Sequence, residues 1–280
     1  MSEYTDKSAF LSFMYGTAVG RVLLKIVTAP AISVIGGKYM DSSISRIHIR
    51  SFAKKNGIDL TQCERTDFHS FNDFFTRKLK SDLRPIDMSE DAFISPCDGR
   101  LSVFHINDNS TFDIKGSNYS VSDLLGGDEL SRKYDYGVCL VFRLCVNDYH
   151  RYCYCASGTK GDNVHIKGVL HTVRPIALRA YPVFVQNTRE YTTIESDRFG
   201  SVTQIEVGAL MIGRISNHDG SGECKKGNEK GMFLYGGSSI IVLLEKDRSS
   251  FPKEWFEQSL NGEEIRVKYG QTLFKATPSL

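Results

Sequence analysis

Downstream of Pro85 the sequence breaks into short runs of β-branched and aromatic residues, which Gly, Asn and Asp separate. The clearest runs cover residues 138–142, 204–215 and 240–244. Apolar runs of this kind, bounded by turn-forming residues, are typical of strands. We therefore predict a β-rich domain over residues 86–280, built from antiparallel sheets in a sandwich or barrel-like arrangement.

Residues 1–85 favour helices instead. Residues 9–35 are strongly apolar, but Gly, Arg, Lys and Pro interrupt them, so no run approaches the ~20 residues that span a bilayer. Further helices are predicted at residues 44–55 and 71–80, and both carry clustered basic side chains. The apolar segment either packs on its own domain or lies in a membrane interface, where basic neighbours suit anionic headgroups. The fold class is therefore α+β, with a helical, membrane-facing region before the β-rich domain.

Composition excludes some classes of protein. The 280 residues are 41% hydrophobic and 24% charged, as expected of a chain that forms a core. The formal net charge of +2 gives no field strong enough to indicate a nucleic-acid partner. The seven cysteines lack the paired spacing of a disulfide framework or zinc ribbon, which favours a reducing cytosolic location. Acidic Glu3 and Asp6 are unlike the basic start of an export signal.

Four short segments stand out from the strand pattern: residues 95–99, 115–120, 148–152 and 236–239. The last reads Gly-Gly-Ser-Ser and runs directly into an apolar strand, so Ser238 lies at the strand's entrance. The glycines allow unusual backbone angles and a close approach of the chain. In such a turn the Ser238 hydroxyl can attack the carbonyl of Gly237 to form an ester, whose elimination leads to a pyruvoyl group. Taken alone, this segment is more simply a plain glycine-rich hairpin, and it indicates this chemistry only together with its neighbours.

Together these segments resemble the phosphatidylserine decarboxylase family across nearly the whole chain. Ser-Pro-x-Asp-Gly, Lys-Gly-x-Asn-Tyr-Ser, Asp-Tyr-His-Arg, Val207-Gly208-Ala209 and the Gly-Gly-Ser turn occur in the family's order and at similar separations. The resemblance implies that Ser238 is the self-cleaving serine and that cleavage follows Gly237. The products would be a β chain of residues 1–237 and a pyruvoyl-capped α chain of residues 238–280. Asp98 matches the aspartate of an Asp-His-Ser relay, in which a carboxylate orients an imidazole.

The implied activity converts phosphatidylserine to phosphatidylethanolamine and carbon dioxide. It proceeds through a Schiff base between the substrate amine and the pyruvoyl group on residue 238, without pyridoxal phosphate or a metal. A lipid substrate accounts for the apolar and basic first third of the chain, and places the protein peripherally on the cytoplasmic side of the cell membrane. The resemblance also implies an α/β heterodimer after cleavage, assembled as a homodimer.

One position departs from the family's His-x-x-His pattern, which assigns the relay role to the second histidine. Cys153 stands there, whereas His150 matches the first histidine, which the resemblance assigns to substrate contact and decarboxylation. Three possibilities stay open: His150 serves both steps, another histidine supplies the base, or maturation is impaired. His171 is the candidate substitute, because a hairpin could bring it beside Cys153. A metal site or thiol nucleophile at His150, Cys153 and Cys155 is disfavoured, because no second ligand pair follows and alternate strand cysteines are more simply small apolar side chains.

Two alternative functions stay open. Relatives of this family decarboxylate free amino acids, and a fold does not fix a pocket, but the N-terminal segment argues against such a substrate. An uncleaved, non-catalytic lipid-binding protein is the second alternative, and Cys153 motivates it. Against it, Asp98, His150, Gly237 and Ser238 are all present.

Overall fold

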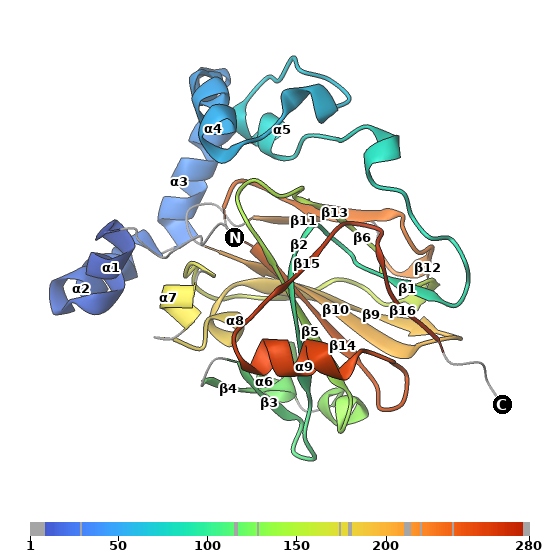
Figure 1. Cartoon of the computed structure of the whole chain (residues 1–280). Helices are drawn as coiled ribbons and strands as arrows, with labels where there is room; N and C mark the ends of the chain where they lie inside the picture. The colour runs from blue at the N-terminus through green and yellow to red at the C-terminus, as the bar shows by residue number, and fades with distance from the viewer. Residues whose placement is uncertain are drawn as a thin grey trace.

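The computed structural model describes residues 9–28, 30–114, 117–127, 129–173, 175–178, 181–209, 214–218, 220–236 and 238–276. Within them, helices dominate the first part of the chain and antiparallel strands the rest, which confirms the α+β class (Figure 1). Gly237 of the predicted cleavage site and Lys115 and Gly116 of the second motif lie outside the described residues. The division of the chain at residue 85 stays a prediction.

The apolar N-terminal segment forms three short helices. They are α1 (Ala9–Gly16), α2 (Ala18–Val27) and α3 (Pro30–Asp41). Leu11, Met14, Tyr15 and Leu24 are buried in a core cluster that they share with strands of the main sheet. No helix within the described ranges is long and apolar enough to cross a membrane.

The two basic helices differ in how well they match the prediction. Residues 44–55 form the 3-10 helix η1 (Ser43–His48) and then α4 (Ile49–Asn56). The helix expected over residues 71–80 was wrong in its second half, because α5 covers only Phe71–Phe75. Arg77 instead turns inward and donates to the carbonyls of Asn147 and Asp148, so the backbone leaves the helical path.

Nine strands form the main sheet, in the order β12-β7-β9-β10-β14-β5-β2-β15, with β8 paired to β9. The predicted runs at residues 138–142 and 240–244 are confirmed as the central strands β5 (Val138–Leu144) and β14 (Ser238–Leu244). Only the first part of the predicted run over residues 204–215 lies in β10 (Gly200–Gly208), because that strand ends at Gly208. The remaining strands are β2 (Gly99–His105), β7 (Gly158–Lys160), β8 (Val164–Ile166), β9 (Arg189–Ser196), β12 (Gly222–Cys224) and β15 (Ile265–Val267).

Smaller sheets and short helices complete the β-rich part. A three-stranded sheet contains β11 (Ile215–Asn217), β13 (Glu229–Phe233) and β6 (Arg151–Cys153). Two-stranded sheets join β1 (Ala92–Ile94) to β16 (Thr272–Lys275) and β3 (Thr111–Ile114) to β4 (Ser117–Ser120). The helices are α6 (Val121–Leu125), α7 (Pro175–Leu178), α8 (Val183–Gln186) and α9 (Lys253–Leu260), and α9 lies along β2 (Figure 1).

The central strands separate two apolar cores. Residues 240, 242 and 244 of β14 belong to a cluster with Tyr152 and Phe233 of the three-stranded sheet, and this side is called the small-sheet face. Residues 241 and 243 belong to a cluster with α1, α7 and α8, on the side called the helical face. Because strand side chains alternate between faces, Ser238 points to the small-sheet face and Ser239 to the helical face. This alternation decides which candidate residues share a side with Ser238.

Candidate active site

Ser238 is the first residue of β14, where Gly208 of β10 and Leu144 of β5 flank it in the sheet. Its side chain is fully buried, and its Oγ has no hydrogen-bond partner among the described residues. A buried hydroxyl without a partner costs about 1–3 kcal/mol. Gly236, two residues earlier, has a φ of 150°, which residues with a Cβ rarely adopt. A buried hydroxyl that lacks a hydrogen bond and follows a turn with an unusual backbone angle marks Ser238 as the candidate reactive group.

His150 lies on the same small-sheet face. It directly precedes β6, and its carbonyl accepts a hydrogen bond of 2.9 Å from the amide of Phe233 in β13. The imidazole is fully buried and packs against the Phe75 ring of α5, with ring centroids 4.0 Å apart. The three-stranded sheet and the N-terminal helical part therefore fix the His150 ring between them.

Hydrogen bonding decides which nitrogen of His150 carries the proton. Nδ1 lies 2.9 Å from the Asp148 carbonyl, which can only accept, so Nδ1 donates and Nε2 keeps its lone pair. Nε2 has no partner in the described part of the chain. Burial, and then the charge of Arg77, lowers the pKa of His150 from 6.5 to about 3. At neutral pH the ring is therefore neutral and has a free lone pair that can accept a proton.

The carboxylate of Asp98, just before β2, is already paired. Arg84 donates two N–H groups to it, one of them at 2.7 Å, and the amide of Tyr269 donates a third at 2.9 Å. In the described part of the chain, no hydrogen bond joins Asp98 to a histidine. Asp98 thus holds Arg84 and Tyr269 in place, and its part in an Asp-His-Ser relay stays a prediction.

Cys153 packs against the same turn as Asp98. Its amide donates to the Pro96 carbonyl at 2.9 Å, and its Sγ lies 3.9 Å from the Ser95 carbonyl. The position of the family's second histidine therefore neighbours the Asp98 turn, as the relay would require. Burial raises the pKa of the Cys153 thiol to about 12. The thiol consequently stays protonated at neutral pH and is a poor base.

His171 belongs to the opposite, helical face. Its Nδ1 lies 3.2 Å from the hydroxyl of Tyr15, and its ring stacks on Tyr181 with centroids 4.8 Å apart. Its main-chain amide donates to the side chain of Asn187, which in turn donates to the Gly208 carbonyl at 2.7 Å. His171 is therefore linked to the Ser238 region through Asn187 and the β10 backbone. The structure brings Ser238 and His150 to one face and His171 to the other.

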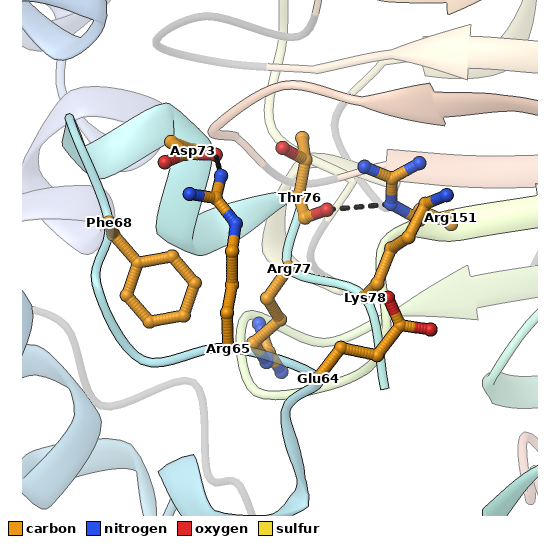
Figure 2. A pocket seen from close by; sticks show the side chains of 8 residues that line it. All are labelled: Glu64, Arg65, Phe68, Asp73, Thr76, Arg77, Lys78 and Arg151. Atoms are coloured by element: carbon orange, nitrogen blue, oxygen red, sulfur yellow. Dashed lines mark hydrogen bonds and ion pairs between the residues drawn. The ribbon is translucent and has the colours of Figure 1, made fainter. Parts of the chain in front are cut away.

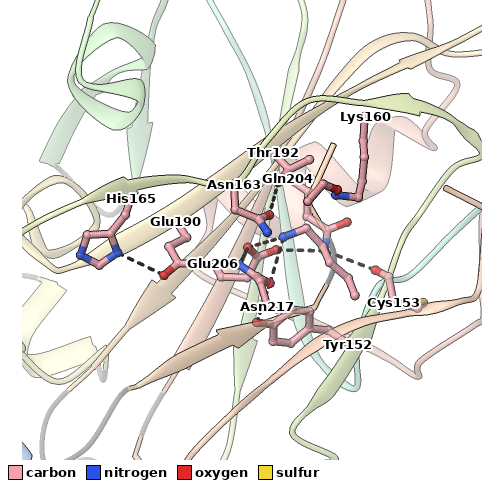
Figure 3. A network of polar contacts seen from close by, with 12 residues as sticks. Tyr152, Cys153, Lys160, Asn163, His165, Glu190, Thr192, Gln204, Glu206 and Asn217 are labelled. Atoms are coloured by element: carbon pink, nitrogen blue, oxygen red, sulfur yellow. Dashed lines mark hydrogen bonds and ion pairs between the residues drawn. The ribbon is translucent and has the colours of Figure 1, made fainter. Parts of the chain in front are cut away.

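Sequence reasoning missed a buried polar network between the main sheet and the three-stranded sheet (Figure 3). Lys230 donates to Glu206 at 2.7 Å and to Asn217 at 3.0 Å, and both charged side chains are fully buried. Gln204 donates to Glu206 at 3.1 Å and to the Cys153 carbonyl at 3.2 Å. The available signal was the alternation of Gln204 and Glu206 with apolar neighbours, which puts two polar groups on one face of a buried strand.

The surroundings of Ser238 fit the expected pyruvoyl group. Conversion of a serine into that group needs a hydroxyl that no structural hydrogen bond holds, at a site from which bulk water is excluded, and Ser238 meets both conditions. Among the described residues, no three His, Cys, Asp or Glu side chains gather as metal ligands would.

Comparisons with known proteins agree with these motifs. The family model described as phosphatidylserine decarboxylase matches residues 71–275. The chain is 40% identical over 268 residues to phosphatidylserine decarboxylase proenzyme 2 of Clostridium acetobutylicum, and the match covers 95% of this chain and 92% of that protein. Proenzymes of Clostridium botulinum and Clostridium perfringens are 39% and 37% identical, with 97% and 94% of this chain and 95% and 92% of those proteins covered. The chain therefore belongs to the phosphatidylserine decarboxylase family.

Proposed function

We propose that the protein converts phosphatidylserine to phosphatidylethanolamine and carbon dioxide after cleaving itself between Gly237 and Ser238. Its family supports the activity, and the name proenzyme of its relatives supports the cleavage. One observation carries the proposal. The buried Ser238 hydroxyl has no partner among the described residues, and His150, whose Nε2 is equally unpartnered, directly precedes β6 of the three-stranded sheet that packs on the same face.

Ser238 is the nucleophile of its own cleavage. Its Oγ attacks the carbonyl carbon of Gly237, the peptide C–N bond breaks, and an ester forms in its place. Loss of the Ser238 α-proton then expels the Gly237 carboxylate. Tautomerisation and hydrolysis of the remaining dehydroalanine release ammonia and leave the pyruvoyl group. That group supplies the carbonyl electron sink for decarboxylation.

His150 is the base in this scheme, so it serves both steps. Its Nε2 takes the Ser238 hydroxyl proton and returns it to the departing amide nitrogen. Cys153 stays protonated, and His171 belongs to the opposite face, so neither competes well for this role. Because burial makes His150 a weak base, we expect cleavage to be slow. Slow cleavage is sufficient, since each molecule is cleaved only once. In turnover, Nε2 of His150 takes a proton from the ammonium group of the substrate and returns it to the substrate α-carbon.

The two product chains stay together as an α/β heterodimer in this proposal. All seven residues of β14 pair with β10 on one side and with β5 on the other. A chain that begins at residue 238 therefore remains in the middle of the sheet without its peptide bond to residue 237. The homodimer stays a prediction.

Apolar side chains on the N-terminal helices support a lipid substrate over a free amino acid. These exposed side chains are Phe13, Val19, Val22, Leu23, Val34, Ile35, Ile44 and Ile47. Exposed apolar groups beside basic Arg21 and Lys25 of α2 suit the interface of an anionic membrane. We propose peripheral binding on the cytoplasmic side of the membrane.

Intact mass spectrometry of the purified wild type beside Ser238→Ala tests the proposal. We expect the wild type to divide after Gly237, with a pyruvoyl terminus on the smaller chain, and the variant to stay whole. Carbon dioxide release from phosphatidylserine, but not from free serine, would then establish the substrate. An uncleaved and inactive wild type would favour the lipid-binding alternative.

A further inference from the structure

A basic pocket lies between the N-terminal helical part and the start of β6 (Figure 2). Its volume is about 170 Å³. One water molecule needs only ~10–15 Å³ by such a measure, so the pocket has room for a small oxyanion. Its lining consists of Glu64, Arg65, Phe68, Asp73, Thr76, Arg77, Lys78 and Arg151.

Two of the four basic side chains have acidic partners and two do not. Arg65 pairs with Asp73, and Arg151 pairs with Glu229 at 2.7 Å. Arg77 and Lys78 form no ion pair within the described residues. With Glu64 included, the lining has four basic and two acidic side chains, so it keeps a net positive charge that an anionic ligand could neutralise.

Arg77 is the unusual member, because its charge is buried. Only 5% of the residue is exposed, and its guanidinium donates to main-chain carbonyls at 3.2–3.4 Å rather than to a carboxylate. Its Nε has no partner in the described ranges. The charges of Asp98 and Asp148 act on Arg77 from beyond ion-pair distance, yet a buried cation without a directly paired carboxylate is costly for the fold, so its presence calls for a function. The planar guanidinium is well suited to bind the oxygens of a phosphate.

The pocket adjoins the residues assigned to chemistry. Arg77 donates to the carbonyls of Asn147 and Asp148, just before His150, and Arg151 donates to the Thr76 carbonyl at 2.7 Å. The His150 ring packs on Phe75, the neighbour of Thr76. Only three covalent bonds separate the phosphorus of phosphatidylserine from its reacting α-carbon, so a headgroup phosphate must lie close to the reactive groups.

We propose that Arg77 and Lys78 form the binding site for the phosphodiester of the substrate headgroup, an inference that rests on the proposed function. The substrate carboxylate is the other anionic candidate. Decarboxylation removes the negative charge of that carboxylate. Tight binding of the carboxylate by arginine would therefore stabilise the ground state and slow the reaction. The phosphodiester keeps its charge throughout, so its binding lowers the energies of ground state and transition state alike.

Binding to the uncleaved Ser238→Ala protein tests the site without any need for activity. We would titrate water-soluble glycerophosphoserine and follow its ³¹P signal. Arg77→Gln should weaken binding on the order of 10- to 100-fold, as the loss of charge-assisted hydrogen bonds predicts. Lys78→Gln should weaken it by about threefold to tenfold, and this exposed residue can be changed without risk to the core. Lys80→Gln, an exposed lysine of the same segment outside the pocket, should have no effect.

Competition experiments then test whether the site recognises the phosphate group or the serine part of the ligand. Inorganic phosphate should displace glycerophosphoserine, whereas serine alone should not. Phosphate that binds without displacing glycerophosphoserine, or unchanged binding in Arg77→Gln and Lys78→Gln, would overturn the assignment. In the matured enzyme, Lys78→Gln should raise KM while kcat and self-cleavage stay near wild type. A wild type that fails to cleave would refute the proposed function alone, because the binding result does not depend on cleavage.

Discussion

Two buried polar regions differ in how their polar atoms are satisfied. In the first, the paired network of Gln204, Glu206, Asn217 and Lys230, both charges have direct partners, and only Gln204 Oε1 lacks one among the described residues. In the second, the reactive cluster of Arg77, His150 and Ser238, each side chain leaves a buried polar atom without a partner among the described residues. The side chains of both regions are buried, so burial alone does not distinguish structure from chemistry.

The difference separates a supporting role from a reactive one. A buried network whose charges are all paired fixes how two sheets pack, and its charged groups have no spare capacity for a substrate. Unpaired atoms cost stability, and they are free to form bonds when substrate or a reacting peptide arrives. We therefore expect changes in the network to act mainly on stability, and changes in the reactive cluster to act mainly on cleavage and binding.

The largest effect on stability is expected for Lys230→Met, because it leaves Glu206 charged and unpaired in the core. We expect the free energy of unfolding to fall by about 3–5 kcal/mol, measured by urea denaturation of the uncleaved Ser238→Ala protein. The double variant Lys230→Met with Glu206→Gln should recover much of the loss. A cost below about 1 kcal/mol for the single change would show that the network does not stabilise the fold in this way.

The next effect concerns cleavage. His150→Gln should slow the division of the chain on the order of 100-fold, the lower end of what a general base contributes. His171→Gln, on the helical face, should leave the rate near that of the wild type. The measurement is a time course of intact mass after rapid refolding. If His171→Gln instead slowed cleavage more than His150→Gln, the base would belong to the helical face, and the unpaired atom of His150 would have no part in cleavage.

Strand composition predicted the central strands correctly, because β5 and β14 are covered on both faces and read as continuous apolar runs. The paired network could not be predicted, since Glu206 and Lys230 meet only when a second sheet crosses β10. Composition predicts Arg77 only as one of the clustered basic side chains of the helix over residues 71–80, because its burial depends on the carbonyls of a distant loop. Similarly, the motifs singled out Ser238 and His150, and an expected hairpin suggested His171, but only the pairing register and the contacts of the two histidines showed on which side each lies.

A smaller effect is the dependence of stability on pH. The pKa of His150 is about 3 in the folded protein against 6.5 when unfolded, so the unfolded chain binds more protons below pH 6.5. Stability is therefore complete above pH 6.5 and falls as the solution becomes more acidic, by about 2 kcal/mol at about pH 5. Urea titrations of Ser238→Ala, with and without His150→Gln, isolate this contribution. Asp148, whose pKa burial raises, contributes with the opposite sign but is present in both proteins. Equal acid sensitivity of the two proteins would contradict a buried, neutral His150.

The smallest effect compares two adjacent serines on opposite faces. Ser238 and Ser239 are both fully buried, and neither hydroxyl has a partner among the described residues. In the slowly cleaving His150→Gln background, Ser238→Ala and Ser239→Ala should each raise the free energy of unfolding by about 1 kcal/mol, because each removes an unpaired polar atom. In the wild-type background only Ser238→Ala should abolish cleavage. A stability gain at Ser239 alone would mean that Ser238 has a hydrogen-bond partner and is positioned by it. That hydrogen bond would then hold the Ser238 hydroxyl in place, and it would have to break before the hydroxyl could attack the Gly237 carbonyl.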